Sequence, residues 1–252
     1  MINISEEKEK MGGRAYKNGL RLMNENYSVK VYYEEDERLR YRLSKVKYNE
    51  YFKHIKKLPV IRGIVSIILA IFSFLKEGIK KPRFYLLIAL IIALDLTYVF
   101  FASGNGSGGG YIIYLYLLIP LVLLFFFRGT VSEVLQYHGA EHKAVNYYEN
   151  DYKGDIDSYS RLHRRCGSNI IFYYFLLSFG LGWLVSEAGL LLFISFEFLC
   201  LGLAYEAVRY TPEKLLFIPQ IFQRVVTREP EEKHLAAAEK ALEILERRGS
   251  KP

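Results

Sequence analysis

The stretch "FYLLIALIIALDLTYVFFA", residues 84–102, contains a single charged side chain, Asp95. A membrane-spanning helix needs about 20 predominantly apolar residues, so this stretch predicts a transmembrane helix. A second apolar run, "YIIYLYLLIPLVLLFFF", covers 111–127 and follows the uncharged link "SGNGSGGG". Because the link is short and rich in glycine, we expect the two helices to form a transmembrane hairpin.

Apolar and charged residues are segregated along the whole chain. The sequence is 51% hydrophobic, and its 34 Lys and Arg against 27 Asp and Glu lie mostly between the apolar runs. Two further runs, about 170–185 and 189–207, predict a second hairpin. The net charge of +7 is explained by the positive-inside rule and by attraction to anionic lipid headgroups. We therefore expect a lipid bilayer as partner, and no nucleic acid, because no compact nucleic-acid-binding motif is evident.

The distribution of basic residues predicts the topology. The links at 103–110 and 186–188 contain no Lys or Arg, whereas the flanking segments are basic. By the positive-inside rule, we expect four crossings of a bacterial cell membrane with both termini in the cytoplasm. The apolar run from Gly63 to Leu75 is too short to span and has basic flanks, which favours an interfacial or re-entrant helix.

The two terminal parts contain weaker structural signals. Val29, Val31 and Tyr33 alternate with polar residues before the acidic "EEDE", and Leu39, Tyr41 and Leu43 alternate after it, which predicts a β-hairpin with one apolar face. Near the C-terminus, Leu235, Ala238, Leu242 and Leu245 form an apolar stripe at helical spacing.

We therefore expect a mainly α polytopic membrane protein with a small β-containing cytoplasmic N-terminal part. Its expected divisions are that N-terminal part (1–62), the interfacial or re-entrant helix (63–83), the first transmembrane hairpin (84–127), a cytoplasmic His/Cys segment (128–169), the second hairpin (170–207) and a cytoplasmic tail with an amphipathic helix (208–252).

The segment "QYHGAEHKAVNYYE", residues 136–149, contains two of the five histidines of the chain. On a helix, His138, His142 and Glu149 lie close to one line, and Glu141 lies beside it. The spelling H-x-x-E-H is the inverted zinc-protease pattern, in which the two His bind zinc and the Glu acts as general base. The alternative is a pair of hydrogen-bonded histidines at the membrane face.

Other residues could complete a metal site with these histidines. His163 and Cys166 lie three apart in "LHRRCGS", and Glu206 lies at the expected cytoplasmic end of the last crossing. A closed set of four ligands is typical of structural zinc, whereas three ligands and an open position are typical of catalysis. Cys200 lies in an apolar run, so we expect no disulfide between the two cysteines.

Several charged residues allow both a functional and a structural interpretation. Asp95 and Glu197 lie inside apolar runs, where ionisable groups are costly, and Glu197 could simply pair with the hydroxyl of Tyr98 or Tyr205. We expect His54 and His234 to lie on solvated faces without a special role. The basic cluster could bind a phosphate or lipid headgroup or anchor the chain at the membrane; its members are Arg161, Arg164 and Arg165.

The wording of these motifs resembles the YqhQ-like family of uncharacterised bacterial membrane proteins, which are sometimes described as predicted metal-dependent enzymes. The resemblance is carried by "YHGAEHK", the following "YYE", "HRRCGS", the late "YE", the tail "QRVVTREP", the early Gly12-Gly13 and "PVIRG" at 59–63. Arg164, Ser168 and Val226 depart from the family pattern. The resemblance implies seven site positions: His138, Glu141, His142, Glu149, His163, Cys166 and Glu206.

Two functions follow as expectations. In the first, the chain is a zinc-dependent hydrolase at the cytoplasmic membrane face, with Glu141 as general base and metal ligands among His138, His142, His163, Cys166 and Glu206; Glu149 could support them. In the second, it is a non-catalytic scaffold or assembly factor for other membrane proteins, and the His/Cys cluster is a structural metal site or a hydrogen-bonded network.

Overall fold

The computed structural model describes residues 10–46, 57–80, 125–185 and 189–249, with a few isolated positions between them. The chain forms two compact units. The first combines Met1–Ile64 with Thr130–Pro252, and the second is Val65–Gly129. The polar segments that the sequence separates by hundreds of residues therefore belong to one unit.

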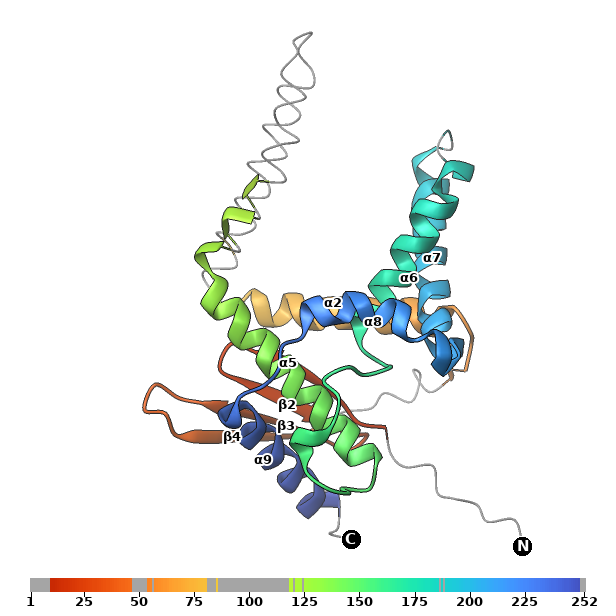
Figure 1. Cartoon of the computed structure of the whole chain (residues 1–252). Helices are drawn as coiled ribbons and strands as arrows, with labels where there is room; N and C mark the ends of the chain where they lie inside the picture. Colours follow the sequence, from red (N-terminus) through yellow and green to blue (C-terminus); the bar gives the residue numbers. More distant parts are fainter. Residues whose placement is uncertain are drawn as a thin grey trace, which may run out of the picture. The chain divides into compact units, whose positions relative to one another are not determined.

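The N-terminal part is a four-stranded antiparallel sheet of order β1-β2-β3-β4 (Figure 1). Its strands are β1 (Gly12–Tyr16), β2 (Gly19–Met23), β3 (Tyr27–Tyr33) and β4 (Leu39–Lys45). The predicted hairpin is confirmed as β3 and β4, with Val29 opposite Leu43 and Val31 opposite Tyr41. β1 and β2 were not predicted, although Asn18-Gly19 at their junction is a strong hairpin signal.

One face of the sheet is covered by α9 (Glu232–Gly249) and by α5 (Arg128–Glu149) (Figure 1). The central strands contribute the fully buried Leu20, Leu22, Val29 and Val31. The predicted apolar face ends before Tyr41, which is 57% exposed. The reason is that α9 packs on β2 and β3, so that the edge strand β4 is largely left outside.

The apolar stripe predicted near the C-terminus is confirmed in α9. Ala238, Leu242 and Leu245 are buried against the sheet, and Leu235 is half-buried there. The prediction that His234 is solvated is wrong. Its ring is fully buried, packs edge-on against Tyr137 with 4.5 Å between ring centroids, and faces the charged side chains of Glu133, Glu231 and Lys233.

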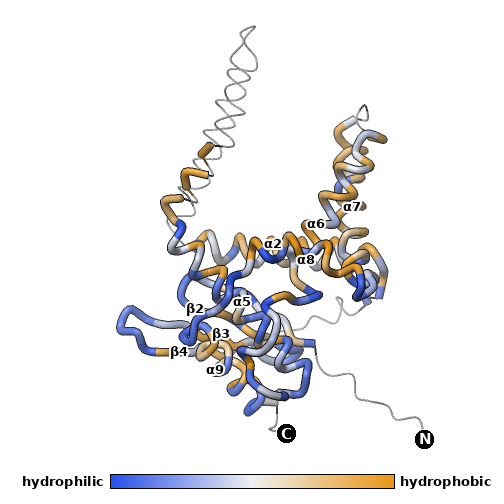
Figure 2. The backbone as a smooth tube through the Cα atoms, in the orientation of Figure 1, coloured by the Kyte–Doolittle hydropathy of each residue, from blue (hydrophilic) through white to orange (hydrophobic). Residues whose placement is uncertain are grey.

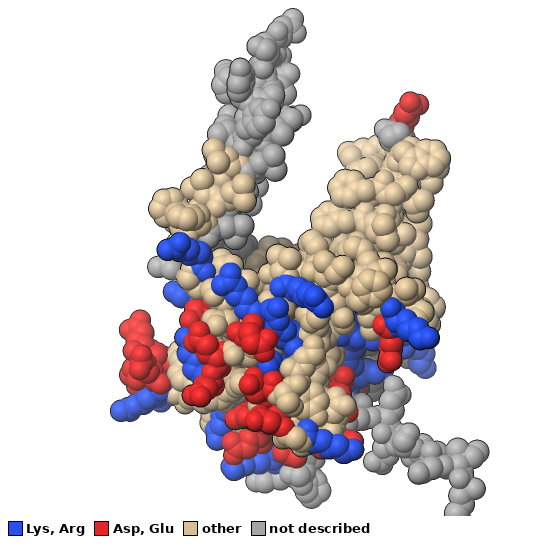
Figure 3. All heavy atoms as spheres, in the orientation of Figure 1, with Lys and Arg blue, Asp and Glu red and all other residues tan. Residues whose placement is uncertain are grey.

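Two helices of the first unit are long and apolar enough to cross a membrane. They are Gly167–Val185, formed by α6 (Gly167–Leu181) and η2 (Gly182–Val185), and α7 (Leu190–Tyr210). The two helices pack against each other, and most of their large apolar side chains are exposed. Figure 2 shows the hydrophobic colour along both, and Figure 3 shows few charged atoms on them. They correspond to the predicted second hairpin.

The start of α2 (Ile61–Gly78) is joined to α7 by an ion pair and by two glycines. Arg62 forms a two-pronged salt bridge with Glu206, and the backbone N–H of Val60 donates to the same carboxylate at 3.2 Å. A Cβ on Gly63 would lie 2.6 Å from Tyr205, and one on Gly202 would lie 2.5 Å from Val60. The "RG" and late "YE" motifs are therefore contact partners.

The second unit includes α2 from Val65 onward. The predicted interfacial or re-entrant segment is helical as expected, and several of its large apolar side chains are exposed: Ile68, Leu69, Ile71, Phe72, Phe74 and Leu75. Its placement at a membrane surface stays a prediction. The predicted first hairpin, 84–127, including Asp95, lies almost entirely outside the described residues, so that four crossings also stay a prediction.

Candidate metal centre

Helix α5 presents His138 and His142 one turn apart. Tyr137, Ala140 and Ala144 fix the orientation of this helix because they are buried in the core over the sheet. At 100° per residue, that orientation turns both histidines to one side, and their ring centroids lie 4.4 Å apart. The spacing that the sequence shows is therefore realised as a pair of neighbouring imidazoles.

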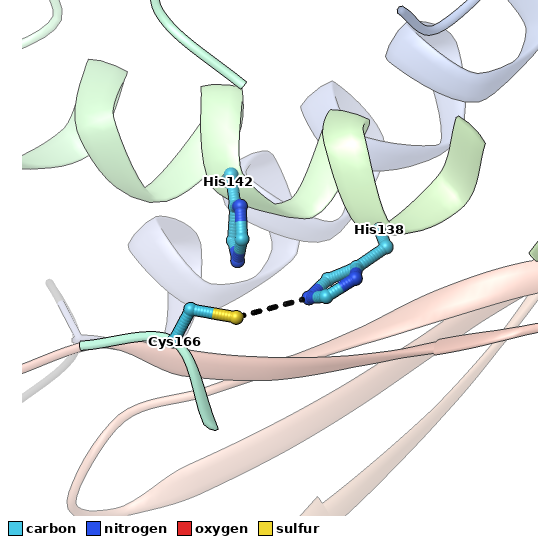
Figure 4. A group of neighbouring side chains, drawn as sticks. All are labelled: His138, His142 and Cys166. Atoms are coloured by element: carbon cyan, nitrogen blue, oxygen red, sulfur yellow. Dashed lines mark hydrogen bonds between the residues drawn. The ribbon is translucent and has the colours of Figure 1, made fainter. Parts of the chain in front are cut away.

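Cys166 completes a cluster with the two histidines. It is the N-cap residue of α6 and is buried, and its sulfur lies 3.6 Å from Nε2 of His138. One ligand atom from each of the three residues lies within 4.8 Å of the other two (Figure 4). Among the described residues, this is the one group of three or more potential ligands that lie so close together.

Backbone carbonyls hold both imidazoles in one tautomer. Nδ1 of His138 lies 2.8 Å from the carbonyl oxygen of Val226, and Nδ1 of His142 lies 2.6 Å from that of Arg161. A carbonyl oxygen only accepts, so each Nδ1 carries the proton and donates it. When the ring is neutral, each Nε2 has its lone pair toward the cluster, which is the arrangement of metal-binding histidines, whereas the protonated ring of His138 donates from Nε2 to the sulfur of Cys166.

The carboxylate of Glu141 lies beside these ligands and is 8% exposed as a residue. Within the part of the chain that the structure describes, no hydrogen bond or ion pair reaches it. Burial raises its pKa, although the nearby His142 and His138 oppose that effect. A buried carboxylate without a partner is costly, so the local structure is suited to a group that binds there.

The protonation of the thiol also suits a cationic ligand. Burial by itself favours the neutral thiol of Cys166, but hydrogen bonds from His138 and His142 outweigh it and lower its pKa to about 4. Conversely, burial disfavours the charged form of His138, whereas the sulfur of Cys166 raises its pKa to about 9. The thiolate is the form of cysteine that binds metals.

Six of the predicted site residues are placed outside the cluster. His163 is 5.9 Å from His142 between ring centroids, and its Nε2 lies 3.2 Å from Glu149, which also pairs with Arg165. Nδ1 of His163 accepts from the backbone N–H of Arg165. His163 and Glu149 therefore form a pair beside the cluster.

The other displaced residues lie farther along the chain. Glu206 is in the ion pair with Arg62, so its carboxylate is not brought to the cluster. Arg161 contacts the carbonyl of Thr227 and the carboxylate of Glu229. Arg164 donates to the backbone carbonyls of residues 209 and 211. All three arginines of the predicted anion site thus have partners within the protein.

The short helix α8 (Phe217–Val226) supports the cluster from a segment that the sequence analysis did not single out. The amide of Gln223 is fully buried, and it accepts from the N–H of His163 and donates to its carbonyl. Val226 supplies the carbonyl for His138. Gly139 allows the chain after α8 to approach α5, because a Cβ there would lie 2.0 Å from the carbonyl oxygen of Arg228.

Two other residues near the cluster were also missed. Lys143 is buried, and its ammonium group contacts Asp157 and Glu229, so it ties the turn after α5 to the segment after α8. Gly13 of β1 faces Glu141, and a Cβ on it would lie 2.6 Å from Cγ of that residue. The early glycine pair and the lysine of "HGAEHK" are present in the sequence motifs, but their partners are remote in sequence.

Glu197, which the sequence places inside an apolar run, has polar partners on the second hairpin. Its carboxylate accepts from the hydroxyl of Tyr174 at 2.7 Å and from that of Ser178 at 3.0 Å. It also lines a cavity of about 240 Å³ between α6 and α7. Glu197 therefore pairs with hydroxyl groups as predicted, but its partners are Tyr174 and Ser178 and not the predicted Tyr98 or Tyr205, of which Tyr98 lies outside the described residues.

Comparisons with known proteins give a family and no activity. The family described as "Protein of unknown function (DUF1385)" matches residues 16–247. An uncharacterised protein of Bacillus subtilis (strain 168), YqhQ, is 28% identical over 96% of this chain and 95% of its own length. No solved structure matches the chain.

Proposed function

We propose that this chain, which belongs to the DUF1385 family of proteins of unknown function, is a membrane-bound zinc-dependent hydrolase. The observation that carries the proposal is the cluster of His138, His142 and Cys166, whose ligand atoms lie within 4.8 Å of one another. Both histidines are fixed by backbone carbonyls with Nε2 turned to the cluster.

The donor set fits zinc better than the harder cations. Two imidazoles and a thiolate are soft or borderline ligands, whereas Mg²⁺ and Ca²⁺ prefer oxygen. Three protein ligands leave one position of a tetrahedral site open, which is typical of catalytic zinc. His163 would close the site, but its Nε2 is directed to Glu149.

Zinc held by His138, His142 and Cys166 would lower the pKa of a bound water. Glu141 would accept a proton from such a water, because its carboxylate lies beside the ligands and has no other partner among the described residues. Burial, which raises the pKa of Glu141, makes it a better proton acceptor and then a donor to the leaving group. The pair of Glu149 and His163 holds the adjoining turn in place.

The setting of the site favours a substrate at a membrane surface. Cys166 directly precedes α6, the first of the two helices that could span a membrane. We propose a multi-pass protein of the bacterial cell membrane with the cluster at the cytoplasmic face, anionic lipid as its surroundings, and a peptide or lipid-linked substrate.

Elemental analysis of the purified protein in mild detergent tests the metal directly, with the double variant His138→Ala/His142→Ala as the matched control. We expect about one zinc per chain in the wild type and a loss of it in the variant. Absence of metal from both proteins, after purification without chelators, would contradict the proposal.

The general base is tested separately by Glu141→Gln. This variant should retain zinc, and hydrolysis of fluorogenic peptide and lipid-ester substrates in vesicles should fall by about 10²–10⁴-fold. Loss of zinc from Glu141→Gln would instead assign Glu141 to the ligands and refute its role as base.

A scaffold with a structural metal site is the second candidate, and one observation favours it. The cluster joins α5, the turn before α6 and the end of α8, which is what a structural metal does. In that case Glu141→Gln is harmless, and His142→Ala unfolds the segment between α5 and α6. Thermal unfolding of the two variants side by side separates the candidates.

A further inference from the structure

Helix α8 exposes an apolar face that no described part of the chain covers. Five large apolar side chains lie at the spacing i, i+1, i+4, i+5 and i+8, which places them on an arc of about 140°. Between 40% and 72% of each is exposed; they are Phe217, Ile218, Ile221, Phe222 and Val225. An uninterrupted apolar face of this kind marks a surface that is covered by something apolar.

The length and position of α8 point to a lipid interface as that cover. The helix has 10 residues, which at 1.5 Å per residue is too short to cross a bilayer. It packs against α6, one of the two helices long and apolar enough to cross a membrane, and Figure 2 shows hydrophobic colour on both. If α6 crosses a membrane, the lipid around it would therefore also reach α8.

Basic side chains lie where headgroups would surround such a helix. Lys214 precedes α8, Arg224 lies beside its apolar face and Arg228 follows it, and all three are exposed. An apolar face flanked by Lys and Arg is the composition of helices that lie in the plane of an anionic membrane surface.

The opposite side of α8 contacts the metal centre. Gln223, about 170° around the helix from the middle of the apolar face, holds the backbone of His163 through both ends of its amide. The carbonyl of Val226 accepts from Nδ1 of His138. A movement of α8 therefore moves the groups that orient His138 and His163.

We infer that α8 is a helix that lies in the plane of the membrane surface, and that its position in the lipid interface keeps the side chains of the metal centre ordered. The membrane position rests on the apolar face and basic flanks of α8 and on its contact with α6, and it does not depend on a bound metal. The link to a metal deepens the proposed function and rests on it, whereas the order of the side chains can be measured without metal.

Quenching of tryptophan fluorescence by lipids with brominated acyl chains tests the position of α8 in the lipid interface. A tryptophan is placed at Ile221 in a Trp183→Phe background, and the protein is reconstituted in vesicles of phosphatidylglycerol and brominated phosphatidylcholine. We expect at least a twofold loss of fluorescence relative to unbrominated vesicles. A tryptophan at the exposed Glu239 of α9 is the control and should keep its fluorescence.

Equal fluorescence of the Ile221 probe in brominated and unbrominated vesicles would refute the position of α8 in the lipid interface. If that probe is also shielded from acrylamide, the face is covered by protein, and a second copy of the chain replaces lipid as the occupant.

Alkylation of Cys166 in vesicles with chelator tests the coupling, in a Cys200→Ala background. Ile221→Glu places a charge on the apolar face, and Gln220→Glu places the same charge on the flank of the same helix. We expect alkylation to be about tenfold faster in Ile221→Glu and unchanged in Gln220→Glu. Equal rates in all three proteins would refute the coupling even if the quenching is observed, and neither measurement depends on bound zinc.

Discussion

Gly13→Ala is the substitution whose effect follows most directly from the geometry. The added Cβ would lie 2.6 Å from Cγ and 2.8 Å from Cδ of Glu141, and 2.7 Å from the carbonyl oxygen of Arg21. Carbon atoms pack at about 3.5–4.0 Å, so each contact is about 1 Å too short. The side chain of Glu141 can move away, but the Arg21 oxygen belongs to the backbone of the neighbouring strand β2 and cannot rotate away, so β1 must move as well.

Overpacking of this kind costs about 1–3 kcal/mol, and for a protein of this size each kcal/mol lowers Tm by about 2–4 °C. We therefore expect a fall of about 2–12 °C in thermal unfolding in detergent. Gly12→Ala is the matched control, because a Cβ there meets nothing within 4 Å. Gly12 also lacks a positive φ, so that its substitution should be neutral or slightly stabilising.

The same pair of variants reports on the carboxylate. Displacement of Glu141 in Gly13→Ala should impair hydrolysis. The zinc content should be unchanged, because none of the three ligands contacts the added Cβ. Equal Tm values for Gly12→Ala and Gly13→Ala would refute the close approach of β1 to α5, and with it the position assigned to Glu141.

Three other predictions concern contacts around the site. Arg62→Met should lower the free energy of unfolding by about 3–5 kcal/mol because Glu206 is left buried without its partner, and Glu206→Leu in the same chain should recover most of the loss in a thermal scan. Burial lowers the pKa of His234, although Glu133 opposes this effect, so the unfolded chain binds the proton first as pH falls. The free energy of unfolding should therefore decrease below about pH 6.5, and His234→Gln should remove this pH dependence in urea titrations. An unchanged pH dependence would assign it to another group. Gly139→Ala should release the segment after α8, seen as faster proteolysis there, because its Cβ would lie 2.0 Å from a backbone oxygen; an unchanged digest would contradict that contact.

The elements with a local signal could be predicted from the sequence. The alternation around "EEDE" and the apolar stripe of α9 were sufficient for β3, β4 and the C-terminal helix, because each buries one face with its own period. The apolar runs of α6 and α7 were equally clear. By contrast, β1 is five residues long and contains two glycines, and a strand without alternation gives no periodic signal.

The site residues also differ in whether a local sequence signal or a tertiary contact places them. His138 and His142 are four apart on one helix, so their pairing followed from the sequence. Cys166 could be named as a candidate ligand. That Cys166 and not His163 joins the cluster depends on the contact between Nε2 of His163 and Glu149, which is a tertiary contact. Glu206 was proposed as a ligand because its partner Arg62, 144 residues away, is not visible from its own neighbourhood. The burial of His234 beside Tyr137 is of the same kind.

The cover of the sheet by α9 has a consequence for synthesis of the protein. The apolar face made by β2 and β3 is complete once Tyr33 has been translated, but the helix that covers it ends at Gly249, 216 residues later (249 − 33). At about 5–20 residues per second, the synthesis of α9 is complete about 10–40 s after that of this face. A ribosome that stalls before α9 would therefore release a chain whose sheet is uncovered. The first unit can complete its fold only after its last helix has been synthesised.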